Sequence, residues 1–202
     1  GGSDNASGAT LGTNSTGSNN TAIGMQAMKA NTTADNNTAV GYQTLYANST
    51  GADNTAVGKD TMVSNTTGSH NTAVGLGALA SNTTADYNTA FGRSALLANT
   101  TGTRNIAIGP GALDANTTGN DNTAMGYNTL TTNTTGLRNT AVGASALLSN
   151  TASDNTAVGY FVLDNCSTGS NNTAVGTECM NACTTGSANV AMGYRALDNM
   201  TT

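Results

Sequence analysis

A short string of small and apolar residues recurs along almost the whole chain. The string is Asn-Thr-Ala-hydrophobic-Gly, and its Asn falls at positions 20, 37, 54, 71, 88, 105, 122, 139, 155, 172 and 189. The spacing is 17 residues, with one interval of 16 between 139 and 155. We number this repeat from 1, at the Asn, to 17. Residues 20–202 then form a single repeat array, and residues 1–19 match the unit in part, as a degraded first coil at its N-terminal edge.

The repeat length and composition point to one architecture. Two helices need about 33 residues or more, and a unit rich in Gly, Thr and Asn does not hold a long helix. We therefore predict an all-β chain, a parallel β-solenoid (β-roll) of about 11 coils with 17-residue repeats. The one deletion falls within 150–154, so repeat positions 12–17 are expected to be loop, because a strand that lost a residue would flip its faces. Gly at position 5 is expected at a bend with positive φ.

Alternation along the first four positions predicts which side chains share a face. Positions 2 and 4 lie on one side of a strand and position 3 on the other. Because position 4 is always apolar, we expect positions 2 and 4, such as Thr38 and Val40, to face the interior. The unvarying Ala at position 3 is then expected to contact another subunit. Position 9 is Leu or Met in every unit, for example Leu45, and predicts a second core rank on a second short strand at positions 7–10.

Composition excludes several classes of protein. Only 8% of the residues are charged and none is Trp, whereas ordinary globular domains carry about 25% charged residues, so we expect no enzyme. Six Lys and Arg residues at a net charge of −5 provide no basic patch for nucleic acid. The longest apolar stretch, residues 157–163, is broken by Gly159 and is much shorter than the ~20 residues that span a bilayer. No membrane span is predicted.

The residues that usually carry site chemistry are sparse. His70 is the single His, which excludes a His-based catalytic triad and a pair of His ligands for zinc. Gly109-Pro110-Gly111 does not complete a dinucleotide-binding fingerprint. We therefore predict no catalytic residues, no metal site and no cofactor. At position 17, Arg104, Asp121, Arg138 and Asp154 alternate in sign, as expected if equivalent positions stack about 4.8 Å apart.

Two cysteines are expected to be neighbours. Cys166 and Cys183 both occupy position 12 in successive units, and in-register stacking would place their Cα atoms about 4.8 Å apart, within the ~4.4–6.8 Å that a disulfide accepts. Two outcomes stay open: a disulfide, which an extracellular setting would favour, or a pair of inert buried thiols. Cys179, at position 8, is expected to be a free core residue.

Position 12 is Met200 in the last unit and Asn in the units before Cys166, mostly within Asn-Thr-Thr sequences. The Asn allows two interpretations. These are glycosylation sequons where a glycosylating pathway exists. The change of this position to Cys166 and Cys183 favours instead an inward ladder of stacked amides. The sequons at Asn19, Asn36 and Asn171 fall in the outer loop and are better candidates for glycan attachment.

The core string also carries a family resemblance. Asn71-Thr72-Ala73-Val74-Gly75 and Asn105-Ile106-Ala107-Ile108-Gly109 resemble the Ser-Val-Ala-Ile-Gly-like repeats of trimeric autotransporter adhesin heads. They are still more similar to the Asn-Thr-Ala-Val-Gly-Tyr-Gln-Ala-Leu repeats of phage and bacterial fibre proteins. The present unit, at 17 residues, is longer than the usual adhesin-head unit, and we expect no anchor, coiled-coil stalk or chaperone domain within this segment.

The resemblance implies an extracellular chain, on a cell surface or a virion, that self-associates as a homotrimer or filament and contacts host or surface glycans. On this basis we expect a structural and adhesive fibre segment that provides rigid extension and surface attachment. Two alternatives remain. One is the subunit of a glycan-coated environmental filament. The other is an ice-binding β-solenoid, in which ranks of Thr at positions 2, 13 or 14 would face water.

Overall fold

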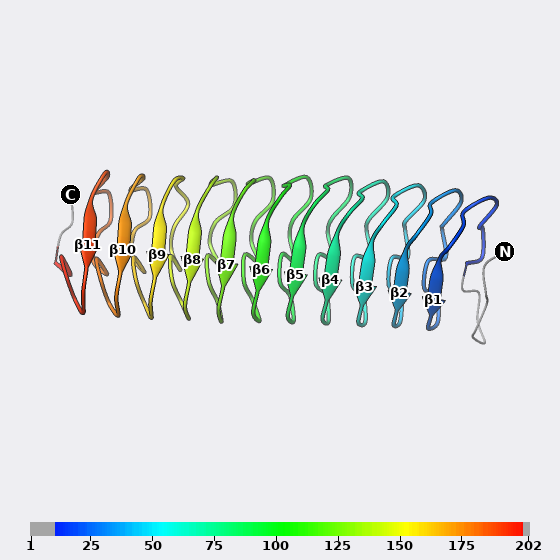
Figure 1. Ribbon diagram of the computed structural model, residues 1–202, viewed down its shortest axis with the longest axis horizontal. Coiled ribbons are helices and arrows are strands. Elements are labelled where there is room, and N and C mark those ends of the chain that lie inside the picture. Colours follow the sequence, from blue (N-terminus) through cyan, green and yellow to red (C-terminus); the bar gives the residue numbers. More distant parts are fainter. Residues whose placement is uncertain (1–10, 200–202) are drawn as a thin grey trace.

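The computed structural model describes residues 11–199 and has one short strand in each coil. Figure 1 shows the strands side by side in chain order along the long axis of the molecule. They form one 11-stranded parallel sheet, and no helix occurs in the part of the chain described. The predicted all-β parallel β-solenoid with a 17-residue repeat is confirmed. The strands are β1 (Thr21–Ile23), β2 (Thr38–Val40), β3 (Thr55–Val57), β4 (Thr72–Val74), β5 (Thr89–Phe91), β6 (Ile106–Ile108), β7 (Thr123–Met125), β8 (Thr140–Val142), β9 (Thr156–Val158), β10 (Thr173–Val175) and β11 (Val190–Met192).

Adjacent coils stack with equivalent residues in register. Ala39 of β2 lies opposite Ala56 of β3, and the same alignment holds across the 16-residue coil, where Thr140 lies opposite Thr156. The deletion therefore falls in the loop, as predicted. Gly at position 5 follows each strand with φ between 122° and 144°. A Cβ on Gly75 would lie 2.5 Å from the carbonyl oxygen of Gly92, so both the backbone conformation and the close approach of the next coil require glycine.

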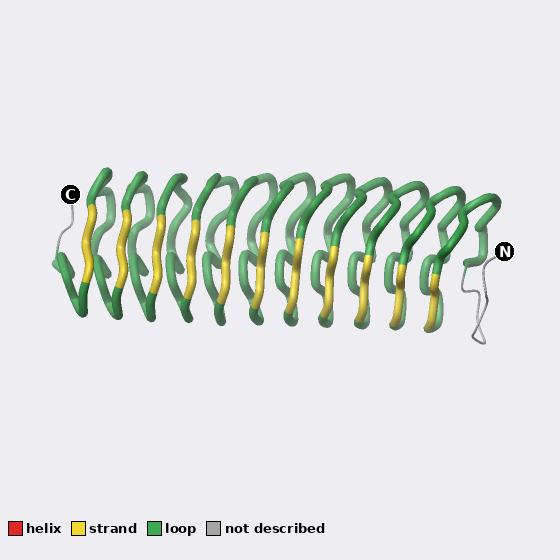
Figure 2. The backbone as a smooth tube through the Cα atoms, in the orientation of Figure 1, coloured by secondary structure: helices red, strands yellow, loops and turns green. Residues whose placement is uncertain are grey.

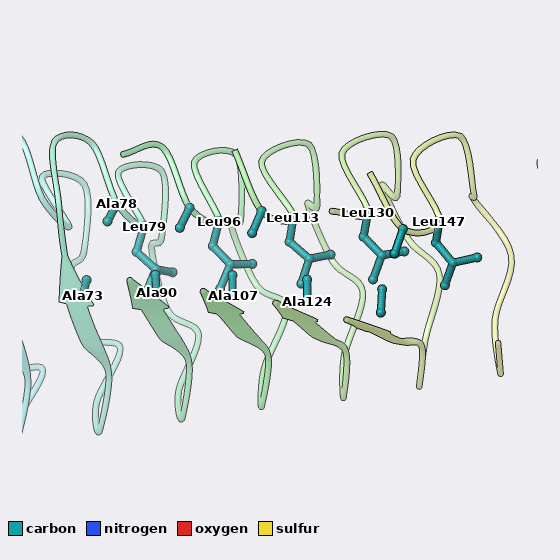
Figure 3. Packing of buried hydrophobic residues seen from close by; sticks show 14 of the residues in the cluster. Ala73, Ala78, Leu79, Ala90, Leu96, Ala107, Leu113, Ala124, Leu130 and Leu147 are labelled. Atoms are coloured by element: carbon teal, nitrogen blue, oxygen red, sulfur yellow. The ribbon is translucent and has the colours of Figure 1, made fainter. Parts of the chain in front are cut away.

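The two faces of each strand are the reverse of those expected. Ala73, at position 3, is fully buried, and the same holds for its equivalents from β2 to β10. Its neighbours Thr72 and Val74, at positions 2 and 4, point outward and are exposed or half-buried. The predicted inward placement of Thr38 and Val40 is therefore wrong, and so is the predicted contact of the Ala rank with another subunit. The interior is narrow, because the position 9 side chains of the opposite wall, such as Leu79, fill it and leave space only for a methyl group (Figure 3).

The opposite wall carries the predicted Leu and Met rank but is not a strand. Leu45 and its equivalents from Met28 to Met180 are fully buried, which confirms position 9 as a core rank in these coils, whereas Leu197 in the last coil is 47% exposed. However, Gln43 and Leu45, at positions 7 and 9, have φ values of 52° and 51°, outside the β region. The predicted second strand at positions 7–10 is therefore wrong, and Figure 2 shows one strand in each coil. The N–H of Leu45 still donates to the carbonyl of Thr61 in the next coil, at 3.0 Å.

The Asn residues at position 12 form the predicted inward ladder. Asn65 Nδ2 donates to Asn48 Oδ1 at 2.8 Å and to the carbonyl of Gly68 at 2.9 Å, and Asn82 Nδ2 donates to Asn65 Oδ1 at 2.8 Å. These side chains are fully buried. Their amides are thus bonded inside the coil, and the alternative interpretation of position 12 as a glycan site does not apply to them.

A second ladder, at position 1, was not anticipated. The N–H of Asn71 donates to Asn54 Oδ1 at 3.0 Å, and Asn54 Nδ2 donates to the carbonyl of Gly68 at 2.9 Å. That carbonyl also accepts the amide of Asn65, so the two ladders meet at position 15 of each coil. Buried carbonyls that have no partner destabilise a fold by about 1–3 kcal/mol each, and the paired ladders satisfy one such group in almost every coil.

The 16-residue coil interrupts the position 12 ladder. Asn150 Nδ2 donates to Ala152 within its own coil at 3.0 Å, and Asn150 Oδ1 accepts from Asn155 Nδ2 at 3.2 Å. Asn133 Oδ1, in the preceding coil, has no hydrogen-bond partner. At the other end of the array, Leu11 is buried and Asn14 Oδ1 accepts from Asn31 Nδ2 at 2.8 Å. The position 9 rank and the position 12 ladder thus extend to the start of the described residues. Residues 1–10 of the expected first coil lie outside the described residues.

Candidate functional site

The outward side chains of the strands form a continuous surface along the molecule. We call this surface, made of repeat positions 2 and 4 of β1–β11, the outer sheet face. Its first rank is Thr, replaced only by Ile106 and Val190, and its second is Val, Ile, Phe or Met. The exposed fraction is 56% for Phe91 and 49% for Ile23. Extended apolar surface on a single chain is typical of an interaction site.

No strand places a charged residue on the outer sheet face. A solvated sheet face normally alternates with polar and charged side chains, and exposed strands usually carry charges. The outer sheet face thus differs from an ordinary solvated sheet face in having apolar and Thr side chains without charged ones. The Ala rank, which was expected to contact another subunit, is buried instead.

The position 17 column on the outer loop carries the ion pairs that the alternating charges predicted. Arg104 Nε lies 2.6 Å from Asp121 Oδ1, and Arg138 Nε lies 2.6 Å from Asp154 Oδ1. The hydrogen bonds from the guanidinium groups lower the pKa of both carboxyls. The resulting stabilisation is present above the unfolded-state pKa and is lost as the pH falls through the lowered folded-state pKa. Because the pairs are exposed to solvent, this contribution is small.

The outer-loop sequon residues lie where the sequence placed them. Asn19, Asn36 and Asn171 are exposed. Asn36 Nδ2 donates to Asp53 Oδ1 at 3.1 Å, and Asn171 Nδ2 donates to Ser170 Oγ at 3.1 Å. These bonds lie at the solvent-facing edge, so the three sites stay accessible, and glycan attachment there stays a prediction.

Cys166 and Cys183 are neighbours, as their spacing predicted. Their Sγ atoms are 4.0 Å apart, and both thiols are free and buried. Burial, with a smaller contribution from Cys183, raises the pKa of Cys166 to about 12. Cys179 is also free and buried, as expected. The two stacked side chains occupy the interior in the same way as the Asn residues that they replace, and Cys166 Sγ lies 3.6 Å from the carbonyl of Gly169.

We expect three titratable thiols per chain in denatured, unreduced protein, because the stacked thiols are free. In the native protein, Cys166 should resist alkylation at pH 8, since the reactive form is the thiolate and the pKa of Cys166 is about 12. Counting with a thiol reagent, with and without denaturant, measures both. One thiol per denatured chain would instead demonstrate the disulfide.

Among residues 11–199, no three His, Cys, Asp or Glu side chains gather in a way that could hold a metal ion. Within the same residues, no helix has the length and apolar character needed to cross a membrane. Comparison of the chain with models of protein families, with curated proteins and with solved structures finds no match.

Proposed function

We propose that the chain is a segment of an extracellular structural and adhesive fibre, on a cell surface or a virion, which provides rigid extension and attachment. We further propose that it associates as a homotrimer through the outer sheet face. The observation that carries the proposal is this face, which runs the length of the array with apolar residues exposed and no charge. Exposed apolar surface of this extent is characteristic of subunit contacts.

The stacking of the coils supports a role in extension. Each coil contacts its neighbours through backbone hydrogen bonds, the two Asn ladders and the buried position 9 rank. All of these interactions run along the long axis. Repeat proteins of this kind are quasi-one-dimensional, and their length grows with the number of repeats without any change in cross-section. Such a stack suits a spacer that holds a contact surface away from its base.

The two ranks of the outer sheet face favour a cyclic assembly. In a ring of identical chains, the Thr rank of one chain can contact a neighbour on one side while the apolar rank contacts the neighbour on the other side. Such head-to-tail contacts close into a ring when the rotation between neighbouring chains closes. The resemblance to trimeric fibre repeats, seen in Asn71-Thr72-Ala73-Val74-Gly75, sets the proposed number at three.

The assembly can be tested by placing charge on the outer sheet face. The double variant Val74→Asp and Ile108→Asp changes two outward side chains and is expected to convert a trimer into a folded monomer. The mass measured by light scattering after size exclusion should then fall from three times the 20.0 kDa chain mass to a single chain mass. Leu76→Asp, at an exposed position outside this face, is the matched control and should stay trimeric. A wild-type chain that is a stable monomer would contradict the proposal.

One observation favours a second candidate, an ice-binding solenoid. The position 2 Thr residues point outward in a straight rank, with neighbours about 4.8 Å apart, and a regular row of hydroxyl groups can match a lattice of water. The neighbouring rank weakens this candidate, because its side chains range from Val74 to Phe91 and Met125 and make the face uneven. Thermal hysteresis from a monomeric wild-type chain would favour the second candidate over the fibre.

A further inference from the structure

One wall of the solenoid has a depression of about 320 Å³, which we call the notch. It lies at repeat positions 6, 7 and 10 of the coils that begin with β5, β6 and β7. Its polar lining includes Arg93, Asp114, Tyr127 and Asn128, and Leu97 and Pro110 also line it. The volume is at the lower end of the ~300–1,000 Å³ typical of small-ligand sites, so the notch fits one small molecule or one unit of a polymer.

The notch exists because one coil lacks long side chains where its neighbours have them. At position 6, Pro110 lies between Arg93 of the preceding coil and Tyr127 of the following one, which are two coils, or roughly 10 Å, apart. At position 7 the same coil has Gly111, with φ of 68°. A Cβ at Gly111 would lie 2.5 Å from Asn128 Oδ1, so glycine lets the amide of Asn128 approach the floor.

The two charged groups of the notch, Arg93 and Asp114, form no ion pair among the described residues. The other three arginines pair with carboxylates, but Arg93 forms no ion pair with any residue that the structure describes. Asp114 likewise forms no salt bridge within residues 11–199, and its partial burial raises the pKa of its carboxyl. A cation, a carboxylate and an amide with unused bonding capacity thus surround one depression. Partly buried polar groups favour a ligand that bonds to them.

We propose that the notch binds a single pyranose ring of a glycan. The exposed ring of Tyr127 offers an apolar platform for the C–H face of a sugar, because an aromatic side chain joins an apolar body to a polar tip. Sugar hydroxyls would donate to the Asp114 carboxylate and accept from the Arg93 guanidinium and the Asn128 amide. This inference rests on the proposed function, since it names the chemical class of surface to which the fibre would attach.

The mixed lining argues against other ligand classes. An anion such as a free phosphate would meet Arg93 but would also meet the carboxylate of Asp114, which repels it. A purely apolar ligand would cover unpaired polar groups without satisfying them. A neutral polyhydroxylated ring can both donate and accept hydrogen bonds, which satisfies both kinds of group in the same small volume.

The test is saturation-transfer difference NMR on the full chain with the methyl pyranosides of glucose, galactose, mannose and N-acetylglucosamine at millimolar concentration. We expect transfer to at least one of the four. Tyr127→Ala, which removes the platform, and Pro110→Tyr, which fills the floor, should each weaken binding roughly tenfold or more. Pro110→Tyr should fold, because position 6 is already Tyr in other coils, for example Tyr42 and Tyr160. Tyr160→Ala, an exposed Tyr at the same repeat position, is the matched control and should bind as the parent does.

Two results would overturn the inference: no transfer to any of the four pyranosides, or transfer that persists in both notch variants, which would place the binding elsewhere on the chain. Failure of the proposed assembly is separable from either result. All notch residues come from one chain, so the monomeric double variant Val74→Asp and Ile108→Asp should bind the same pyranoside as the trimer does. A monomeric wild type that binds through the notch would contradict the assembly and leave the glycan site standing.

Discussion

Replacing Ala73 with Asp is expected to lower the free energy of unfolding by about 4 kcal/mol or more. Ala73 is fully buried against the Leu rank, so the new carboxylate would have neither room nor a partner for its charge. Urea titration followed by far-UV circular dichroism measures the loss, and a variant that does not fold would give a larger one.

Two neighbouring substitutions provide the controls for Ala73→Asp. Val74→Asp introduces the same charge one residue later, on the outer sheet face, and should keep the parental β-rich spectrum although it weakens assembly. Leu76→Asp, whose side chain is 48% exposed, should change the free energy of unfolding by less than about 1 kcal/mol. A folded Ala73→Asp chain with parental stability, or a Val74→Asp chain that is unfolded, would show that the strand faces are not as described.

The second large effect is expected in the position 12 ladder. Asn82→Ala removes the donor to Asn65 Oδ1 and to the carbonyl of Ala85, at 2.8 and 3.0 Å, and the acceptor for Asn99 Nδ2 at 3.0 Å. The Ala85 carbonyl keeps the amide of Asn71, and Asn99 Nδ2 keeps the carbonyl of Gly102, but the buried Asn65 Oδ1 is left without a partner. The free energy of unfolding should therefore fall by about 1–3 kcal/mol.

The equivalent substitution in the 16-residue coil separates the ladder from the local turn. Asn150→Ala removes one bond within its own coil and one to Asn155, but no bond to the amide of Asn133. The stability loss should therefore be clearly smaller than for Asn82→Ala when both are measured by urea titration. Equal losses would mean that stacking between coils adds nothing to the bonds that each Asn makes locally.

The repeat alone was enough to predict the architecture. A strict 17-residue spacing, a glycine at position 5 and a deletion confined to one segment leave few options other than a stack of coils. The position 12 ladder could also be predicted, because the replacement of Asn by Cys166 and Cys183 indicates a side chain that faces the interior. The position 1 ladder offered no such contrast, since Asn occupies it in every unit.

The strand faces and the second wall could not be predicted for different reasons. Alternation places Thr72 and Val74 on one face of the strand and Ala73 on the other, but it does not show which face is interior. The larger side chains were expected inside, and this was wrong because the Leu and Met residues of the opposite wall already fill the core. Leu79 shows the periodicity of a buried residue, yet its φ is 51°, and a pattern of burial does not report a dihedral angle. Bulky residues adopt such values only when their surroundings enforce them.

The notch depends on residues that sequence patterns do not group. Its outline comes from side chains in three successive coils, and its floor from Pro110 and Gly111 of the middle coil, which has no long side chain at positions 6 and 7. The sequence feature that marks the notch is the run Gly109-Pro110-Gly111, which departs from the repeat. It predicts a depression only when the longer side chains of the coils stacked on either side are considered with it.

The unpaired oxygen of Asn133 has a consequence for how the molecule carries a tensile load. In a stack where each coil touches only its neighbours, force along the axis passes through every interface in series, and the weakest interface yields first. The junction between the coils that begin at Asn122 and Asn139 lacks one amide link that the preceding junctions have. The later junctions lack this link as well, because Cys166 and Cys183 replace the ladder Asn. Under tension the fibre is therefore expected to part at or beyond the junction after residue 138 and to leave the coils of residues 20–138 as one intact rod.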